Sequence, residues 1–257
     1  MSKKCILITG ATDGIGLATA KKLQSLGHTV IVHGRNKEKL ERIKNELGVK
    51  TFRADLSSLA ETKAFTRDVL AAYSQIDILI NNAGVFKTAQ PRTADNFDVR
   101  YVVNTFAPYL ITKELLPILN NGRVINLSSA AQATVDLDAL LGKVELNDFD
   151  AYAQSKLAIT MWTRHMANEL GSDGPILISV NPASLLGTKM VKEGFNTEGN
   201  DISIGVDILT SLALDSEHSH HSGDYYDNDI QSYSSPQADG SDNDKAKQIV
   251  QAIEEIL

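Results

Sequence analysis

Short apolar runs alternate along the chain with longer segments in which apolar positions recur every three or four residues. Five runs stand out, at residues 5–9, 29–33, 76–81, 123–128 and 176–181. Their nearly continuous Val, Ile and Leu content is typical of strands buried on both faces of a parallel sheet. The longer segments, among them 16–26, 37–47 and 104–119, have the spacing of amphipathic helices and would supply the crossovers that parallel strands require. The pattern therefore predicts a doubly wound α/β fold.

Two segments break this alternation without suggesting a second domain. Residues 132–147 follow the fifth predicted strand and are expected to form a partly helical excursion. Residues 215–244 are rich in Ser, Asp, His and Asn, and only Tyr225 and Tyr226 suggest a short final strand within them. The chain closes with a predicted helix over 244–257. We expect residues 1–257 to form one domain, because single α/β domains of this length are common.

The charge balance and the single cysteine restrict the possible partners and the compartment. The chain carries 25 Lys and Arg against 32 Asp and Glu, a net charge of −7, with no long basic run, which argues against a nucleic-acid partner. No apolar stretch reaches the length of about 18 residues that a membrane-spanning helix needs. Cys5 has no second cysteine to pair with, which is consistent with a reducing compartment. We expect a cytoplasmic protein without a membrane span.

A glycine-rich turn, "TGATDGIG" at residues 9–16, follows the first predicted strand. Glycine at such a turn lets the backbone approach a pyrophosphate, and the helix that follows directs its free N–H groups and its positive dipole end at the anion. A glycine-rich turn without a ligand could have the same sequence, but the place at the first strand-helix junction favours a dinucleotide site. The expected contacts in this turn are Gly10, Thr12, Asp13, Gly14, Ile15 and Gly16.

The end of the second predicted strand indicates which dinucleotide binds. An acidic residue there would accept hydrogen bonds from a ribose 2′-OH, whereas this chain has Gly34 followed by Arg35, which leaves space and a cation for a 2′-phosphate. NADP is therefore favoured over NAD. The alternative is that Arg35 is a solvated surface cation, as Lys37 and Lys39 could be.

A tyrosine and a lysine, Tyr152 and Lys156, lie four positions apart in a predicted helix and so share one face of it. A nearby ammonium would favour the tyrosinate and lower the phenol pKa from about 10, which would suit Tyr152 to proton transfer at a carbonyl. Alone, such a pair is more often a solvated surface feature. Here other polar residues accompany it, because Ser128 and Ser129 end the fifth predicted strand, where ligands bind in α/β sheets.

Several segments together resemble the short-chain dehydrogenase/reductase family, in the family's order and over nearly the full chain. These are the glycine turn, "NNAG" at 81–84, Asn104, the serine pair, and "YAQSK" at 152–156. The resemblance implies a Rossmann-type three-layer sandwich, with about seven parallel strands flanked by helices. It also implies that Ser129 holds the substrate oxygen, Tyr152 transfers the proton, Lys156 binds the nicotinamide ribose and tunes the tyrosine, and Asn104 supports a proton-relay water.

The same resemblance extends the predicted cofactor site and indicates a branch of the family. The tail and the spacing between the serine pair and the tyrosine are similar to those of the retinol dehydrogenases and of the oxidoreductase part of WW-domain oxidoreductases. The further cofactor contacts that it implies are Asn36, Asp55, Leu56, Asn82, Ala83, Gly84, Pro182 and Thr188. The chain departs from the family at Ala183, where glycine is usual, and Thr188 comes one position late. Ala183 disfavours a positive φ, so the loop there is expected to run differently.

Three further features each allow two interpretations. Residues 184–200 have the length of a substrate lid, with Met190, Val191 and Phe195 as its apolar lining, or they are an ordinary surface loop. The histidines of residues 217–223 have no usual zinc spacing, so no metal site is expected. The apolar residues of 158–170 could form core or a subunit interface, and by resemblance we expect a homodimer or homotetramer. These residues are Ile159, Met161, Trp162 and Met166.

The sequence thus predicts an NADP-dependent oxidoreductase that transfers a hydride between the nicotinamide and a small-molecule carbonyl or alcohol, with NAD as the less favoured cofactor. One alternative is a catalytically silent regulator or redox sensor that binds a dinucleotide on the same fold. A sugar-nucleotide epimerase would need a larger C-terminal domain than the chain leaves after Asn181.

Overall fold

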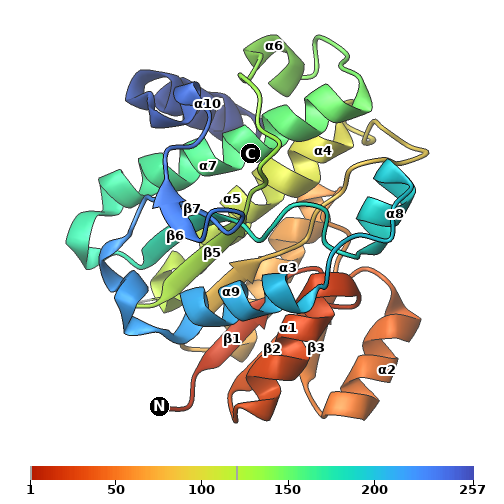
Figure 1. Cartoon of the computed structure of the whole chain (residues 1–257), viewed down its shortest axis with the longest axis vertical. Helices are drawn as coiled ribbons and strands as arrows, with labels where there is room; N and C mark the ends of the chain where they lie inside the picture. Colours follow the sequence, from red (N-terminus) through yellow and green to blue (C-terminus); the bar gives the residue numbers. More distant parts are fainter. Residues whose placement is uncertain (1, 120) are drawn as a thin grey trace.

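The computed structural model, which describes residues 2–119 and 121–257, is built around one eight-stranded sheet with the order β3-β2-β1-β4-β5-β6-β7-β8 (Figure 1). The first seven strands are parallel, and β8 is antiparallel to β7. The strands are β1 (Cys5–Ile8), β2 (Thr29–Gly34), β3 (Lys50–Arg53), β4 (Ile78–Asn81), β5 (Arg123–Leu127), β6 (Ile176–Asn181), β7 (Tyr225–Asp227) and β8 (Ser232–Ser234).

Helices cover both faces of this sheet. One face carries α1 (Gly14–Ser25), α2 (Lys37–Leu47) and α9 (Ser203–Leu214), and the other carries α3 (Leu59–Ala72), α5 (Ala107–Leu115) and α7 (Asp148–Leu170), as Figure 1 shows. The other α-helices of the described residues are α4 (Val99–Tyr101), α6 (Leu137–Leu140), α8 (Lys189–Phe195) and α10 (Asn243–Ile256), and a π-helical turn (Val102–Phe106) follows α4. The predicted Rossmann-type, three-layer α/β fold is confirmed.

Alternation along the strands divides the core into two layers. In β1, Ile6 and Ile8 face α1, α2 and α9, whereas Leu7 between them faces α3, α5 and α7. All three side chains are fully buried. Because successive side chains of a strand point to opposite faces, a strand that is covered on both sides must be apolar at every position. This requirement explains the continuous apolar runs of the sequence.

The strand order reverses between β1 and β4, which defines the functional edge of the sheet. β1 pairs with β2 on one side and with β4 on the other, so that Ile8 lies opposite both Val32 and Ile80. The crossovers therefore leave this point in opposite directions and open a crevice outside the carboxyl ends of the strands. The predicted glycine turn and the segment 81–84 both begin at this crevice.

The C-terminal helix α10 packs against α7 and closes the core on that side, as Figure 1 shows at the dark blue end of the chain. Trp162 of α7 is fully buried and meets Tyr109 of α5 edge-on, with 5.4 Å between the ring centroids. Ile159, Met161 and Met166 are buried in the same cluster. Of the two interpretations of these residues, the structure thus supports core within one chain.

Two strands differ from what the apolar runs indicated. β3 has an exposed residue at each end, and β8 is a three-residue strand of Ser, Tyr and Ser. Both are edge strands, which have less apolar surface to bury than central strands and so lack a continuous apolar run. In the described part of the chain, 2–119 and 121–257, no helix has the length and apolar character needed to cross a membrane.

Candidate active site

The turn between β1 and α1 accepts only glycine at two positions. Gly10 has a φ of 63°, and a Cβ added there would lie 2.7 Å from the Cα of Ala83. A Cβ on Gly16 would lie 2.3 Å from the Nδ2 atom of Asn82. Both distances are impossible for real side chains, so the turn leaves its backbone bare beside the segment after β4. Such a bare turn at a helix N-terminus fits a pyrophosphate.

Asn82 and His33 hold this turn in place. The Asn82 amide donates to the carbonyl oxygens of Thr9 at 2.8 Å and Gly10 at 3.1 Å. His33 accepts the Gly10 N–H at Nδ1, 3.2 Å away, and its Nε2 lies 3.2 Å from the carbonyl oxygen of Ala54. Because Nδ1 accepts a hydrogen bond and Nε2 faces a carbonyl oxygen, the ring must be the neutral imidazole with its proton on Nε2. Burial lowers the pKa of His33 to about 4. His33 was not among the predicted site residues.

Asp13 ties the glycine turn to α2. Its carboxylate caps α1 by accepting the Gly14 N–H at 2.9 Å, and it pairs with Lys39 of α2 at 2.6 Å. The hydrogen bond from Lys39 is the largest effect that lowers the Asp13 pKa. Thr12 packs against Gly34, because a Cβ on Gly34 would lie 2.3 Å from the Thr12 methyl group. Lys39 is therefore an ion-pair partner within the chain, and not a free surface cation.

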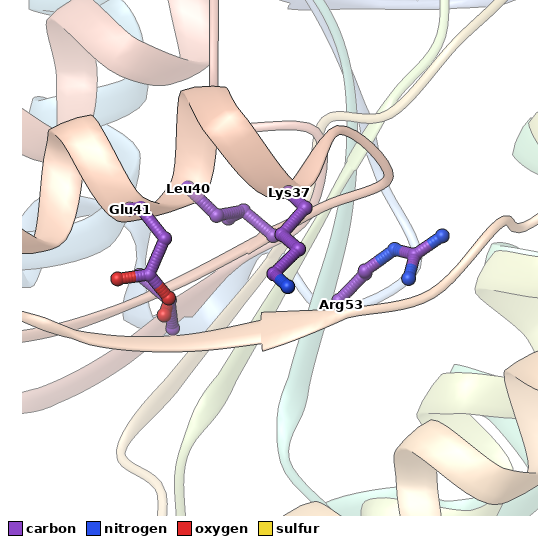
Figure 2. A pocket seen from close by; sticks show the side chains of 5 residues that line it. Lys37, Leu40, Glu41 and Arg53 are labelled. Carbon is purple, nitrogen blue, oxygen red and sulfur yellow. The ribbon is translucent and has the colours of Figure 1, made fainter.

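Cations gather where β2 and β3 end. The exposed Arg35 side chain lies 3.9 Å from the carboxylate of Asp55, and Arg53 donates from Nε to the Arg35 carbonyl oxygen at 3.2 Å. Lys37 and Arg53 line a hollow of about 290 Å³ between α2 and β3, where Figure 2 shows the two side chains beside each other. Arg53 was not among the predicted site residues. Its signal in the sequence was only its position at the end of an edge strand.

Other predicted cofactor residues in this region have structural contacts of their own. Asn36 caps α2 by accepting the Lys39 N–H at 2.9 Å. Asp55 accepts the N–H of Ser57 at 3.0 Å, and Leu56 is buried in the core. These residues could therefore contact a nucleotide only through main-chain groups or through side-chain oxygen lone pairs that are not already used in these hydrogen bonds.

Tyr152 and Lys156 lie on the same face of α7, as their spacing predicted. The Lys156 Nζ atom is 5.6 Å from the centre of the Tyr152 ring and donates to the carbonyl oxygen of Leu127 at 2.7 Å. Lys156 is 4% exposed, and burial lowers its pKa to about 8. Phe86 packs on the Tyr152 ring at 5.0 Å between centroids.

The structure does not show the expected lowering of the Tyr152 pKa by Lys156. Burial raises the pKa of Tyr152, and the opposing contribution comes from hydrogen bonding with the side chain of Ser129. The physical reason is that desolvation penalises the tyrosinate, while the Lys156 ammonium is held by the Leu127 carbonyl oxygen.

The two serines after β5 have different surroundings. Ser128 is 4% exposed, and its hydroxyl donates to the Lys156 carbonyl oxygen at 2.8 Å and lies 2.8 Å from that of Thr160. Ser129 is less buried and interacts with Tyr152. The geometry therefore favours Ser129 over Ser128 as the serine that can reach a substrate, in agreement with the sequence prediction.

Asn104 lies in the π-helical turn before α5 and is 1% exposed. Its Oδ1 accepts the Val85 N–H at 2.9 Å, and its Nδ2 donates to the Val85 carbonyl oxygen at 3.0 Å and to the Ser155 hydroxyl at 2.9 Å. Ser155 donates in turn to the Tyr152 carbonyl oxygen at 2.7 Å. Asn104 thus joins the segment after β4 to the turn of α7 that carries the tyrosine. Single-turn π-helices are frequent at functional sites.

Helix α8, part of the predicted lid, contributes residues next to this group; in Figure 1 it is the cyan helix at the right of the view, above α2. Thr188 caps α8 and comes next to the glycine turn, 3.6 Å from where a Cβ on Gly14 would be. The Met190 methyl group lies 3.8 Å from a Cβ built on Gly84, and Phe195 stacks on Phe86 with centroids 5.4 Å apart. The structure therefore brings Thr188 beside the glycine turn despite its shifted position in the sequence.

The expectation that Ala183 avoids a positive φ is wrong. Ala183 has a φ of 139°, and Leu185 follows with 51°. Asp229 fixes the loop around them, since it accepts the Ser184 N–H at 2.8 Å and an N–H of Asn181 at 2.9 Å. These contacts offset the cost of a conformation that side chains disfavour, and strain of this kind is often found at functional sites. Pro182, the predicted contact just before, is buried.

Two of the three histidines of 217–223, His218 and His221, are engaged in other contacts. His218 is 3% exposed and lies between the hydroxyls of Ser211 and Tyr233, at 3.1 and 2.8 Å. His221 pairs with Asp224 at 2.8 Å. Among residues 2–119 and 121–257, no group of three His, Cys, Asp or Glu side chains could hold a metal ion.

Known proteins are similar to this chain in sequence. A family model described as short chain dehydrogenase matches residues 4–199. Polyprenol dehydrogenase of Homo sapiens is 31% identical over 206 residues, which cover 74% of this chain and 62% of that protein. Retinol dehydrogenase 12 of Bos taurus is 34% identical over 211 residues, with 75% of this chain and 64% of that protein covered. The chain thus matches a little under two thirds of the length of these relatives.

Solved structures share the fold. An uncharacterized protein from Mycobacterium paratuberculosis superimposes with a TM-score of 0.83 at 23% identity, covering 99% of this chain and 93% of that one. A short chain dehydrogenase from Escherichia coli CFT073 complexed with NADPH gives a TM-score of 0.70 at 25% identity, covering 88% and 97%. A reductase from Brucella melitensis complexed with NADH gives 0.70 at 24%, covering 87% and 96%. The chain belongs to the short chain dehydrogenase family, and retinol dehydrogenases are among its relatives.

Proposed function

We propose that this chain is an NADP-dependent oxidoreductase that transfers a hydride between the nicotinamide and a carbonyl or alcohol carbon. The observation that supports this most is the convergence of Ser129, Tyr152 and Lys156 beside the bare glycine turn. The turn fits a dinucleotide on physical grounds, because side chains are excluded at Gly10 and Gly16 where a pyrophosphate would lie.

The roles of the residues follow from their atoms. The cofactor, when bound, supplies or accepts the hydride. The Ser129 hydroxyl donates to the substrate oxygen, and the Tyr152 hydroxyl gives or takes the proton at that oxygen. Lys156, with an ammonium that burial makes easier to deprotonate, holds the nicotinamide ribose, while hydrogen bonding with Ser129 opposes the rise that burial causes in the Tyr152 pKa. Asn104 positions this group through Ser155 and the segment after β4.

Replacing Tyr152 by Phe tests the central assignment. We expect kcat to fall by at least about 100-fold, because a general acid or base contributes 10²–10⁴-fold, while NADPH affinity falls only modestly. Turnover of NADPH against a panel of aldehydes, ketones and quinones, and of NADP against apolar alcohols such as retinol and polyprenols, provides the assay. Unchanged turnover by Tyr152→Phe would refute the role. Nucleotide binding without turnover of any panel member would favour a silent regulator.

The preference for NADP rests on the cations around Arg35. Arg35, Lys37 and Arg53 lie where the adenosine ribose of a dinucleotide comes close in this fold, and no acidic residue follows β2. Relatives in solved structures hold NADPH in one case and NADH in another, so the fold permits either cofactor.

Arg35→Ala should weaken NADPH binding roughly 10- to 100-fold, since a charge-assisted contact to phosphate is lost. NADH binding should not change. Titration of the cofactor fluorescence measures both affinities, and Arg67→Ala, at an exposed position on α3, is the charge-matched control. Equal weakening of NADPH and NADH would refute a 2′-phosphate contact.

The remaining expectations belong to this proposal. The substrate is a small molecule that reaches Tyr152 past Phe86, Met190 and Phe195, whose apolar surfaces suit an apolar alcohol or carbonyl. The protein acts as a homodimer or homotetramer in the cytoplasm. With α10 packed on α7, a subunit interface would form on other surfaces than the buried face of α7.

A further inference from the structure

The main-chain carbonyl of Ser129 accepts hydrogen bonds from the side chains of two other residues. Gln132 donates from Nε2 at 3.0 Å, and Tyr225 of β7 donates from its hydroxyl at 3.1 Å. Side-chain donors in proteins commonly bond to the main chain. Here two of them converge on one carbonyl, and one comes from 96 positions away, so that this peptide is held from two directions. The loop after β5 is thereby held to the last strands of the sheet.

The orientation of the Gln132 amide is unambiguous. Its Oε1 accepts the N–H of Gln237 at 2.9 Å, and a main-chain N–H can only donate. The nitrogen must therefore face the Ser129 carbonyl oxygen and the Ser128 hydroxyl, the latter at 3.2 Å. Gln132 thus links the loop after β5, which carries Ser128 and Ser129, to the C-terminal segment before α10.

Tyr225 is a dependable donor over the whole pH range of an assay. It is 5% exposed, and burial followed by the negative charges of Asp227 and Asp229 raises its pKa well above the usual value. Its neighbour Tyr226 faces the other side of the sheet, where it packs against the cluster of α1, α2 and α9. The described structure shows no hydrogen bond of the Tyr226 hydroxyl.

The anchored carbonyl belongs to the residue whose hydroxyl interacts with Tyr152. The Ser129 hydroxyl also accepts the Ala131 N–H at 3.1 Å, so both polar groups of Ser129 are held within one short turn. Catalytic groups must be fixed to a fraction of an ångström for their full effect. We propose that Tyr225 and Gln132 are positioning residues that fix the Ser129 hydroxyl for the substrate oxygen. This inference rests on the proposed function.

Tyr225→Phe removes one anchor and keeps the ring. We expect kcat to fall about three- to tenfold, as the loss of a single hydrogen bond suggests, with the NADPH dissociation constant unchanged and only a small fall in the melting temperature. Tyr226→Phe removes a hydroxyl from the adjacent position of the same strand and should leave kcat unchanged. An equal loss in both variants would show a general effect on β7 and overturn the proposal.

A double-mutant cycle separates positioning from a merely structural role. If Tyr225 acts only through Ser129, Tyr225→Phe should have no further effect on kcat in a Ser129→Ala background. Independent, multiplicative losses would overturn the proposal. Gln132→Glu should behave in the same way, because it places an oxygen against the Ser129 carbonyl oxygen while the Gln237 N–H keeps its acceptor.

A readout without turnover keeps this test independent of the proposed function. Wild-type turnover and Tyr152→Phe decide whether the chain is an oxidoreductase. Amide hydrogen exchange of residues 128–133 decides whether the anchors hold the loop. We expect Tyr225→Phe and Gln132→Glu to accelerate exchange there, and Tyr226→Phe to leave it unchanged. Unchanged exchange in all three variants would refute the anchoring even in a protein that shows no turnover.

Discussion

At the scale of single residues, the cofactor turn depends on a neutral imidazole. His33 accepts the Gly10 N–H and faces the Ala54 carbonyl oxygen, and a second proton on the ring would replace the acceptor with a donor. The sequence placed His33 at the end of a buried strand but gave no sign of this role, because its partner Gly10 lies in the turn that follows a different strand. Arg53 was missed for the same reason. Motif spacing identifies residues that act together within one turn of the chain. Contacts between residues at the ends of neighbouring strands can be predicted only when the pairing register of those strands is known.

His33 should make the stability of the protein depend on pH. Its pKa is about 4 in the folded chain, against the ordinary value of 6.5 that we expect once the chain unfolds, so the unfolded chain binds more protons between these values. Stability from His33 is therefore complete above pH 6.5 and is lost as the pH falls toward 4, by up to about 3 kcal/mol.

Urea unfolding at several pH values between 4 and 7 measures this effect. His33→Gln cannot titrate and should show a flatter decline of the free energy of unfolding in that range, whereas His220→Gln, at an exposed position, should keep the wild-type decline. Parallel curves for all three proteins would exclude His33 as the source.

At the scale of elements, α7 serves both the core and the site. Its 23 residues, Asp148–Leu170, are flanked by the caps Asn147 and Gly171, and its buried face extends from Ala151 to Ala167. The helix could be predicted because its motif and its apolar positions agree. Whether its apolar face contacts another subunit or the same chain could not be predicted. The answer depends on where α10 packs, and the sequence of an amphipathic terminal helix does not specify which surface it packs against.

Ile253 tests how much α10 contributes to this packing. The side chain is fully buried in the cluster that contains Trp162. Ile253→Ala should lower the free energy of unfolding by about 2–5 kcal/mol, through lost burial and the cavity that remains. Glu255→Ala, at an exposed position of the same helix, should change it little, and chemical denaturation of both variants gives the comparison. A small loss in Ile253→Ala would mean that α10 is loosely attached.

At the scale of the whole molecule, the sequence predicted the layers and the place of the site, because buried parallel strands must be apolar on both faces and ligands bind where they end. The positive φ of Ala183 and the raised pKa of Tyr152 were not predictable in the same way. The first depends on the distant carboxylate of Asp229, and the second on how much solvent the surrounding helices exclude.

The two borders of the sheet have a consequence for how copies of the protein behave when concentrated. Strands at such borders carry unpaired main-chain groups that invite another chain to add on, which leads to aggregates. β3 has a charged residue at each end, Lys50 and Arg53, and these charges would have to be buried between two copies. β8 has only three residues, and Pro236 follows two positions after it. Neither border offers a long, uncharged template. We therefore expect the sheet edges to resist the addition of strands from another copy when the protein is concentrated.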